Sequence, residues 1–278
     1  MPGKLYIVAT PIGNLEDITF RAVRILKEVD LIAAEDTRHS KKLLTHFGIN
    51  TPLTSYHDHN ENLKTEQLLE KLNYGTNIAL ITDAGTPCIA DPGYRIVQAA
   101  INAEIDIIPV PGPSALIAAI SASGLPTDRF AFEGFLPPKS GKRIKVLEEL
   151  KSEQRTLIFY EAPHRLQKTL KDMSDIFGAR KGIIARELTK IHEEFNYGTF
   201  KELFNIYNNQ KIKGEIVILV PPAGENPGFS EEQLTELLFE ELKQNNSSTK
   251  SAVTKISNIT GVSKGKLYEL AVIMKNNK

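Results

Sequence analysis

The sequence of 278 residues has one cysteine, equal numbers of positive and negative side chains, and no long apolar run. Cys88 therefore cannot form a disulfide within the chain, and a zinc site built on several thiolates is excluded. A bilayer-spanning helix needs about 20 apolar residues in succession, and no run reaches that length. The N-terminal residues lack the apolar segment and cleavage site of a signal peptide. We expect a cytoplasmic protein that does not enter a membrane.

The balance of charge limits how the protein can bind nucleic acid. Lys and Arg number 34, and Asp and Glu also number 34, so the formal net charge is zero. Proteins that bind nucleic acid usually carry a basic excess, so any such contact here must come from a local patch. Hydrophobic residues make up 41% of the chain and charged residues 24%. These values are typical of a soluble globular protein, and the length is enough for two domains.

Short apolar segments alternate with amphipathic segments along the chain. We expect strands at residues 5–9, 31–34, 77–82, 105–110, 157–160, 182–185 and 215–220. Most of them are apolar on both faces, as strands are when helices cover both sides of a parallel sheet. Helical spacing of apolar residues occurs at 19–29, 63–72 and 114–121. This alternation predicts an α/β architecture.

Proline-rich segments divide the chain. The segment PVPGPSA (109–115) predicts a stiff joint between two α/β domains, 1–112 and 113–222, because its prolines end a strand before the next helix. The segment PPAGENPG (221–228) has no periodicity and is typical of a linker.

The last segment, 229–278, differs from the rest. A leucine stripe on an acidic helix precedes a small helical hairpin with helix-turn-helix spacing. From residue 245 to residue 278 there are six lysines and one acid, Glu269. Two interpretations remain open at this point. The hairpin either completes a core or a dimer contact, or it touches nucleic acid through residues such as Lys264 and Lys266.

The sequence has no G-x-G-x-x-G motif, so neither a dinucleotide-binding fold nor the common methyltransferase fold is supported. Three other loops rich in Gly and Pro follow expected strands: ATPIGNLEDIT (9–19), DAGTPCIADPG (83–93) and PGPSA (111–115). Ligands of open α/β sheets bind beyond the carboxyl ends of the strands. Asp83 could accept hydrogen bonds from a ribose diol or an ammonium group, and the helix start at Ser114 could attract an anion. Each feature alone would also fit a plain turn or helix cap.

Four polar clusters complete the set of candidate sites: EDTR (35–38), SYHDHNE (55–61), YEAPHR (160–165) and ARELTKIHEE (185–194). His57 and His59 have no third ligand nearby in the sequence, so no metal site is predicted. Four basic residues of these clusters could contact phosphate groups, although each alone would fit an ordinary surface or ion-paired residue. They are Arg38, Arg165, Arg186 and Lys190.

Taken in order, and together with FEGFLP (132–137), these segments resemble the ribosomal small-subunit RNA ribose 2′-O-methyltransferases of the tetrapyrrole-methylase-like superfamily. The resemblance runs from about residue 4 to residue 220, and the basic C-terminal hairpin resembles that of longer members. It implies two α/β domains with S-adenosylmethionine in the cleft between them, and a homodimer. It also implies methylation of the ribose of a cytidine in the decoding region of small-subunit ribosomal RNA, as free RNA or in the assembled subunit.

The resemblance carries cofactor-binding roles to nine positions: Pro11, Gly13, Asp83, Ala84, Gly85, Ile89, Ser114, Ala115 and Tyr160. Tyr160 stands where superfamily members often have methionine, and Cys88 where they often have glycine. A ribose hydroxyl is a poor nucleophile while protonated, so a general base is expected. The candidate bases are Glu35, His57 and Glu187. Candidate RNA contacts are Arg38, Arg165, Arg186, Lys190, Lys264 and Lys266, and no metal is required.

Other functions stay open on the sequence alone. A porphyrinoid methyltransferase could use the same scaffold, although EDTR, YEAPHR and the basic tail favour RNA. A non-catalytic RNA-binding or regulatory module could use the cofactor only as a signal. A knotted-fold ribose methyltransferase is disfavoured because its glycine-rich C-terminal cofactor region is absent.

Overall fold

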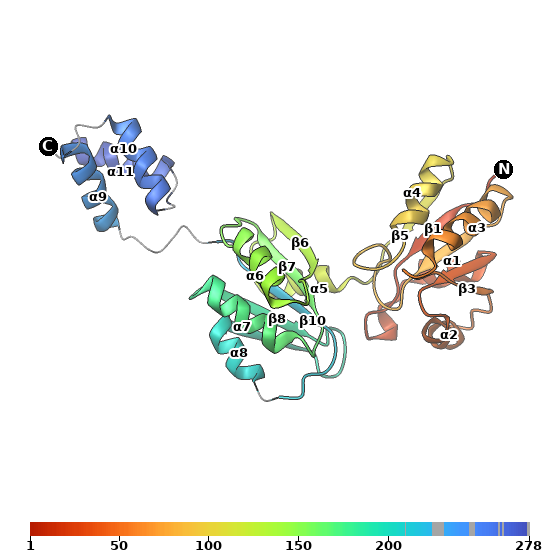
Figure 1. The fold of residues 1–278 in the computed structure, drawn as a ribbon. Helices are drawn as coiled ribbons and strands as arrows, with labels where there is room; N and C mark the ends of the chain where they lie inside the picture. The colour runs from red at the N-terminus through yellow and green to blue at the C-terminus, as the bar shows by residue number, and fades with distance from the viewer. Residues whose placement is uncertain (209, 224–230, 245–247, 261, 263, 277–278) are drawn as a thin grey trace.

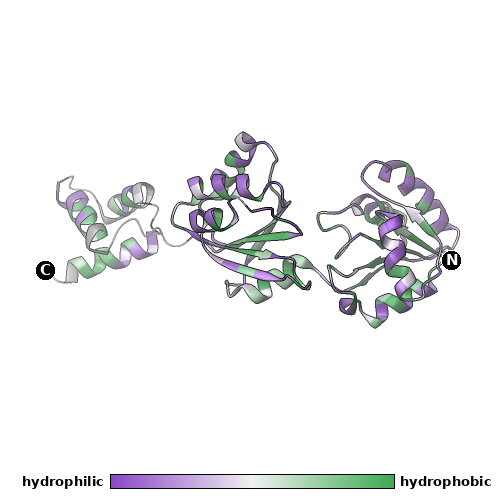
Figure 2. Cartoon of the chain, turned by 90° about the horizontal axis from the view of Figure 1, so that it is seen from below, coloured by the Kyte–Doolittle hydropathy of each residue, from purple (hydrophilic) through white to green (hydrophobic). Residues whose placement is uncertain are grey.

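The computed structural model describes residues 1–208, 210–223, 231–244, 248–260, 262 and 264–276. Figure 1 shows two α/β domains followed by a separate group of helices near the C-terminus. Figure 2 shows that the strands inside both domains are predominantly apolar, whereas polar residues lie mainly on the helices around them. We keep the proposed boundaries, 1–112, 113–222 and 229–278, and call the three parts the first domain, the second domain and the C-terminal unit.

The first domain is built on a parallel sheet with the strand order β3-β2-β4-β1-β5. Its strands are β1 (Leu5–Val8), β2 (Leu31–Ala34), β3 (Leu53–Ser55), β4 (Ile78–Ile81) and β5 (Ile107–Val110). Helices α1 (Phe20–Glu28) and α2 (Thr37–His46) share one apolar cluster with the sheet, and helices α3 (Glu61–Asn73) and α4 (Tyr94–Asn102) share the other. Because all strands run the same way, their carboxyl ends meet at one edge.

The second domain has a mixed sheet with the strand order β6-β7-β10-β8-β9. Its strands are β6 (Phe130–Phe135), β7 (Thr156–Glu161), β8 (Lys181–Arg186), β9 (Glu194–Thr199) and β10 (Ile216–Val220). β6 and β7 are parallel, but β10 runs antiparallel to β7 and β8, and β9 runs antiparallel to β8. The loop 187–193 explains part of this pattern, because a connection that short can join only antiparallel neighbours. The expected parallel sheet is therefore found in the first domain and not in the second.

Helices cover both faces of the second sheet, which explains why its inner strands are apolar on both sides. α6 (Ser140–Glu149), α7 (Leu166–Phe177) and α8 (Phe200–Tyr207) pack on one face. α5 (Ala115–Ser123) packs on the other. The central strand β10 is buried along its whole length.

The C-terminal unit contains α9 (Glu231–Gln244), α10 (Thr249–Thr260) and α11 (Lys264–Asn276). Its apolar residues pack among themselves, with Leu238, Val253 and Leu267 at the centre. The expected hairpin thus forms a small core with the preceding helix. Most of the expected linker, 224–228, lies outside the described residues. Among the helices that the structure describes, none is both long and apolar enough to cross a membrane.

Candidate active site

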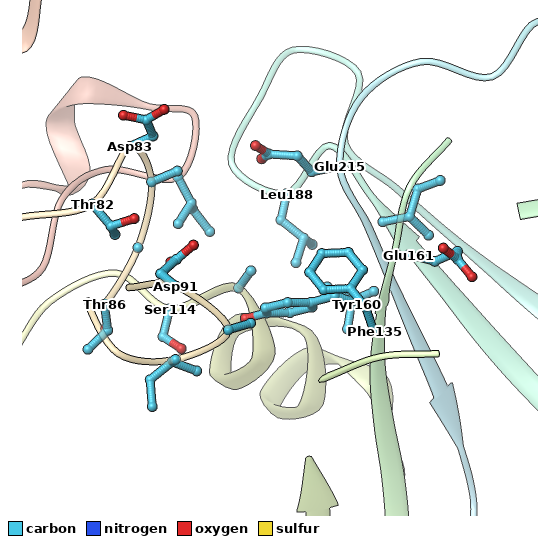
Figure 3. A pocket seen from close by; sticks show the side chains of 18 of the residues that line it. Thr82, Asp83, Thr86, Asp91, Ser114, Phe135, Tyr160, Glu161, Leu188 and Glu215 are labelled. Carbon is cyan, nitrogen blue, oxygen red and sulfur yellow. The ribbon is translucent and has the colours of Figure 1, made fainter. Parts of the chain in front are cut away.

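A cavity of about 380 Å³ lies between the two α/β domains, a size suited to a small-molecule ligand. Loops of both domains line it (Figure 3). The first domain contributes Ile12, Glu35, Thr82, Asp83, Ala84, Gly85, Thr86, Ile89, Ala90 and Asp91. The rest of the lining is Ser114, Ala115, Phe135, Tyr160, Glu161, Ala162, Pro163, Leu188, Gly214, Glu215, Ile216 and Val217.

Hydrogen bonds bring the three Gly- and Pro-rich loops together at this cavity. Thr10 and Gly85 exchange backbone hydrogen bonds of 2.9 and 3.0 Å, which join the loop after β1 to the loop after β4. Gly85 has a φ of 90°, a conformation that favours glycine. The Thr86 hydroxyl donates to the Pro113 carbonyl at 3.1 Å and so reaches the third loop. The strand order thus gathers at one edge three segments that are far apart in the sequence.

Acidic side chains dominate the first-domain side of the cavity. One Glu35 oxygen accepts from the Thr82 hydroxyl at 2.5 Å and from the Asp83 backbone N–H at 3.3 Å. Burial raises the pKa of Asp83 above its usual range. Burial, and then the negative charge of Glu35, raises the pKa of Asp91 to about 7. Figure 3 shows the Asp91 carboxyl group pointing toward the space between the two sides. These acids suit a ligand that carries positive charge.

The opposite side of the cavity is mainly aromatic and apolar, although Glu161 and Glu215 also line it. The Tyr160 hydroxyl accepts a hydrogen bond of 3.2 Å from the Leu116 N–H in the first turn of α5. The Tyr160 ring meets Phe132 and Phe135 edge-on, with centroids 4.8 and 5.7 Å away. Ser114 is the N-cap residue of α5, but its side chain makes no capping bond and instead lines the cavity. An acidic side facing a mainly aromatic and apolar side fits S-adenosylmethionine, which combines cationic groups with an aromatic base.

The three candidate bases occupy different positions. Glu35 lines the cavity. His57 follows β3 at the same sheet edge, where its Nε2 lies 3.3 Å from the Asn60 amide nitrogen and its ring 6.0 Å from that of His59. Within the described chain, no three His, Cys, Asp or Glu side chains are arranged to hold a metal ion. The structure therefore brings Glu35 to the cavity and leaves His57 outside its lining.

Glu187, the third candidate base, is held in a network with Lys190 and Glu215. Its Oε1 accepts from Lys190 Nζ at 2.8 Å and from the Glu215 N–H at 3.1 Å. Burial acts to raise the pKa of Glu187, but the hydrogen bonds from Lys190 and Glu215 outweigh it and lower the pKa. A carboxylate with a lowered pKa is a weaker base, so this network disfavours Glu187 as the general base.

Lys190 connects the two domains. Its Nζ also contacts Glu215 at 3.2 Å, and its side chain crosses over Gly13 of the first domain. A Cβ atom at Gly13 would overlap the side-chain carbons of Lys190. Gly13 therefore makes room for a side chain of the other domain. Of its loop, Ile12 lines the cavity, while the cofactor roles of Pro11 and Gly13 stay predictions.

The other predicted RNA contacts are distributed over the whole chain. Arg38 is 90% exposed in its side chain and pairs with Asp36 at 2.9 Å. Arg165 is mostly buried between Glu161 and the Leu136 carbonyl. Arg186 pairs with Glu194 at 2.6 Å. Lys264 is exposed at the start of α11, and Lys266 is partly buried on the same helix. The structure does not gather these residues at one place, and their roles stay predictions.

Several cavity residues were not expected from the sequence. Asp91 lies in a loop that the sequence does select, but the pattern alone cannot rank it above Asp83. Phe135 belongs to the FEGFLP segment, whose composition gives no reason to place its aromatic ring in a site. Leu188 lies within the selected ARELTKIHEE segment, but nothing in the sequence distinguishes it from its neighbours. Glu215 begins an expected strand, and only the fold brings it to the cavity beside Leu188.

Comparison with known proteins agrees with the fold. The family model of Tetrapyrrole (Corrin/Porphyrin) Methylases matches residues 4–203. "Ribosomal RNA small subunit methyltransferase I" of Synechocystis sp. is 49% identical over 273 residues, covering 97% of this chain and 98% of that protein. The protein of the same name from Pseudomonas aeruginosa is 48% identical over 278 residues, covering 97% of each.

A solved structure supports the same assignment at the level of the fold. Uroporphyrin-III-C-methyltransferase from Thermus thermophilus superposes with a TM-score of 0.56 at 20% identity, covering 80% of this chain and 95% of that one. The chain therefore belongs to the tetrapyrrole (corrin/porphyrin) methylase family, in the branch of the ribosomal RNA small subunit methyltransferase I proteins.

Proposed function

We propose that this protein transfers the methyl group of S-adenosylmethionine to the ribose 2′-hydroxyl of a cytidine in the decoding region of small-subunit ribosomal RNA. Identity of 48–49% to two small-subunit methyltransferases, over almost the whole length of each chain, carries the proposal. The substrate would be the RNA itself or the assembled subunit, in the cytoplasm. The relatives' names support methylation of this RNA, and the resemblance described above supports the ribose position.

The residues around the cavity suit this reaction. S-adenosylmethionine supplies an already activated methyl group, so positioning provides much of the acceleration. Asp83 and Asp91 would hold its cationic groups. The first turn of α5 at Ser114 and Ala115 and the ring of Tyr160 would form the opposite wall. Together they would fix the donor and exclude water from it.

A ribose hydroxyl must lose its proton as the new bond forms. Glu35 is the best-placed candidate base, because it lines the cavity and Thr82 holds one of its oxygens at 2.5 Å. A positioned base typically adds about 10²- to 10⁴-fold to the rate. His57 and Glu187 remain the alternatives. Glu35→Gln should therefore lower kcat by at least about 100-fold.

The test is transfer of a tritiated methyl group to small subunits purified from cells that lack this protein. Label in RNA at one cytidine, with the adjacent phosphodiester bond resistant to alkali, would establish ribose methylation. Label on a base would contradict the ribose assignment. No label in any RNA, with cofactor binding shown by calorimetry, would contradict the function and favour a tetrapyrrole substrate or a sensing role.

We infer that the protein acts as a homodimer. One helix, α5, covers its face of the second sheet, and Ile117 on that helix is 50% exposed. Tyr197 is 57% exposed and pairs in register with Ile183, whose side chain packs on the α5 side. Exposed apolar residues on one face support a protein contact. Ile117→Glu should convert a dimer to a monomer in sedimentation velocity, and a wild-type monomer would contradict the inference.

A further inference from the structure

Acidic residues are missing from one stretch of this neutral chain. From Thr37 to His57 there is no aspartate or glutamate, although the two signs balance over the whole sequence. The stretch includes helix α2, whose sequence TRHSKKLLTH carries Arg38, Lys41 and Lys42. A local surplus of this kind is what an RNA contact on a neutral protein requires.

The three cations of α2 face outward together. Ser40 and Leu44 are buried, which fixes the opposite face of α2 against the domain. Arg38, Lys41 and Lys42 stand at helical spacings i, i+3 and i+4, so they share one exposed face, called here the basic stripe. In the described part of the chain, Arg38 has an ion pair with Asp36, and no ion pair is found for Lys41 or Lys42.

The basic stripe begins beside the cavity. α2 starts two residues after Glu35, which lines the cavity. The Asp36 N–H, just before α2, donates to Asp83 at 3.1 Å. Burial raises the pKa of Asp83, and the positive charge of His39 on α2 opposes that shift. A phosphate group on the stripe would therefore lie close to a nucleotide whose ribose enters the cavity.

A groove of about 830 Å³ lies along α1 and the end of α2. His46 and Phe47 line it at the end of α2, and their rings meet edge-on at 4.8 Å. Phe20, at the start of α1, is 98% exposed on its rim. Two acids, Glu16 and Glu28, also line it, and Glu28 pairs with Arg24 at 2.8 Å. An exposed aromatic ring next to cations is suited to stacking an unpaired base.

We propose that the outward face of α2 binds the backbone of single-stranded RNA next to the target nucleotide, and that the neighbouring groove holds an unstacked base against Phe20. The proposal rests on the proposed function, because it names how the RNA substrate is held. The lysines would contact phosphate oxygens without reading the sequence. Stacking on Phe20 requires an unpaired base, so the stripe and groove together suit a single strand and not a duplex.

The first test is binding of a labelled single-stranded RNA oligonucleotide to the full-length protein at several salt concentrations. Lys41→Ala combined with Lys42→Ala should weaken binding about tenfold, and each lost phosphate contact should reduce the slope of log K against log salt by about 0.7. Lys168→Ala with Lys171→Ala is the matched control, because it removes two exposed lysines from α7 in the second domain. The control should change neither quantity.

Phe20→Ala separates the groove from the basic stripe. This variant should weaken RNA binding about tenfold without changing the salt slope, because stacking releases no counterions. Since Phe20 is almost fully exposed, the substitution should leave the melting temperature unchanged. Cofactor binding by calorimetry should also match the wild type in all of these variants.

The outcomes distinguish this proposal from the proposed function. Unchanged RNA affinity and salt slope in the lysine variant would overturn the α2 contact, whatever the methyl-transfer assay shows. The wild-type protein could methylate no RNA and the lysine variant could still bind RNA more weakly than the wild type. That result would support the α2 contact and contradict the proposed function. Phe20→Ala could change the sedimentation coefficient and leave RNA affinity unchanged. That result would show that the groove forms a contact between copies of the chain, and it would overturn its role in RNA binding.

Discussion

Asp91 is the cavity residue whose charge depends most directly on pH near neutrality. Burial and the neighbouring charge of Glu35 raise its pKa to about 7, so the neutral form is favoured in the folded protein. An acid whose pKa is raised by folding stabilises the folded protein fully when the pH is below its usual pKa. This stabilisation is lost as the pH rises through about 7. Asp91→Asn should therefore raise the melting temperature of the cofactor-free protein more at pH 8 than at pH 5.

The same residue should make cofactor binding depend on pH. A cationic cofactor binds the charged carboxylate, so wild-type affinity should rise from pH 6 to pH 8 and level off above the pKa of about 7. Asp91→Asn should bind more weakly and lose most of this dependence. Calorimetry at several pH values measures both effects. If the variant keeps the same pH dependence, the dependence belongs to another group, such as Asp83. Burial also raises the pKa of Asp83.

Gly13 and Lys190 should be energetically coupled across the domain boundary. Gly13→Ala would place a Cβ atom in the path of the Lys190 side chain and should cost about 1–3 kcal/mol of stability. In a Lys190→Ala background the same change should cost much less, because the obstacle is gone. Urea unfolding of the four proteins measures the coupling. Gly141→Ala is the matched control, since nothing lies within 4 Å of its added Cβ.

These residues show how far a sequence can lead toward a site. Asp83 and Ser114 follow strands in loops of unusual composition, Tyr160 lies near the end of β7, and all three line the cavity. The sequence selects the loop that holds Asp91 but not the residue, because its burial and its distance from Glu35 arise only on folding. Lys190 is in a cluster that the sequence does single out. Its contact with Gly13 could not be foreseen, since it joins two domains.

At the scale of elements, strong apolar patterns were easier to predict than mixed ones. The expected strands at 77–82 and 215–220 correspond to β4 and β10, which are buried throughout. β9 was not expected, because its sequence EFNYGT is half polar and it forms the edge of its sheet. β6 is interrupted near Gly134, where its pairing with β7 shifts register. Edge position and irregular pairing are tertiary properties that leave little mark on the sequence.

A buried ion pair joins α6 to α7 and should contribute strongly to the second domain. Arg143 is 2% exposed, donates to Asp172 at 2.7 Å and also donates to the Pro137 and Pro138 carbonyls at 3.2 Å. Removing one partner leaves the other charge buried and unpaired, which typically costs about 3–5 kcal/mol. Asp172→Ala should therefore lower the free energy of unfolding by about that amount in urea denaturation.

The control for this pair is an exposed pair on the same domain. Glu148 lies 3.8 Å from Lys151 with both side chains about half exposed, so Glu148→Ala should cost less than about 1 kcal/mol. Replacing both Arg143 and Asp172 with apolar residues should recover much of the stability lost in the single variant. A loss below about 1 kcal/mol in Asp172→Ala would show that the pair contributes no more than a surface contact.

At the scale of the whole molecule, acidic and basic side chains gather at different sites. The cavity is acidic on one side, where a cationic cofactor would bind, and the basic stripe on α2 lies outside it. A neutral total charge therefore says little about either site. The cavity also needs both domains, because Glu35, Asp83 and Asp91 come from the first and the aromatic rings of Phe135 and Tyr160 come from the second. Neither domain alone could hold the cofactor that the family implies.

The C-terminal unit should fold and act separately from the cofactor site. Its apolar residues pack among themselves, and its described part carries exposed lysines such as Lys250 and Lys264. A chain ending at Ala223 should keep the melting temperature and cofactor affinity of the first two domains. Its KM for small subunits should rise several-fold while kcat stays within twofold, because losing phosphate contacts weakens binding of the subunit and does not change the methyl-transfer step.

Full-length protein with Lys264→Ala and Lys266→Ala should show part of the same rise in KM. Equal KM values for the long and short chains would instead assign the unit to packing or dimer contact, which sedimentation of both chains would then distinguish.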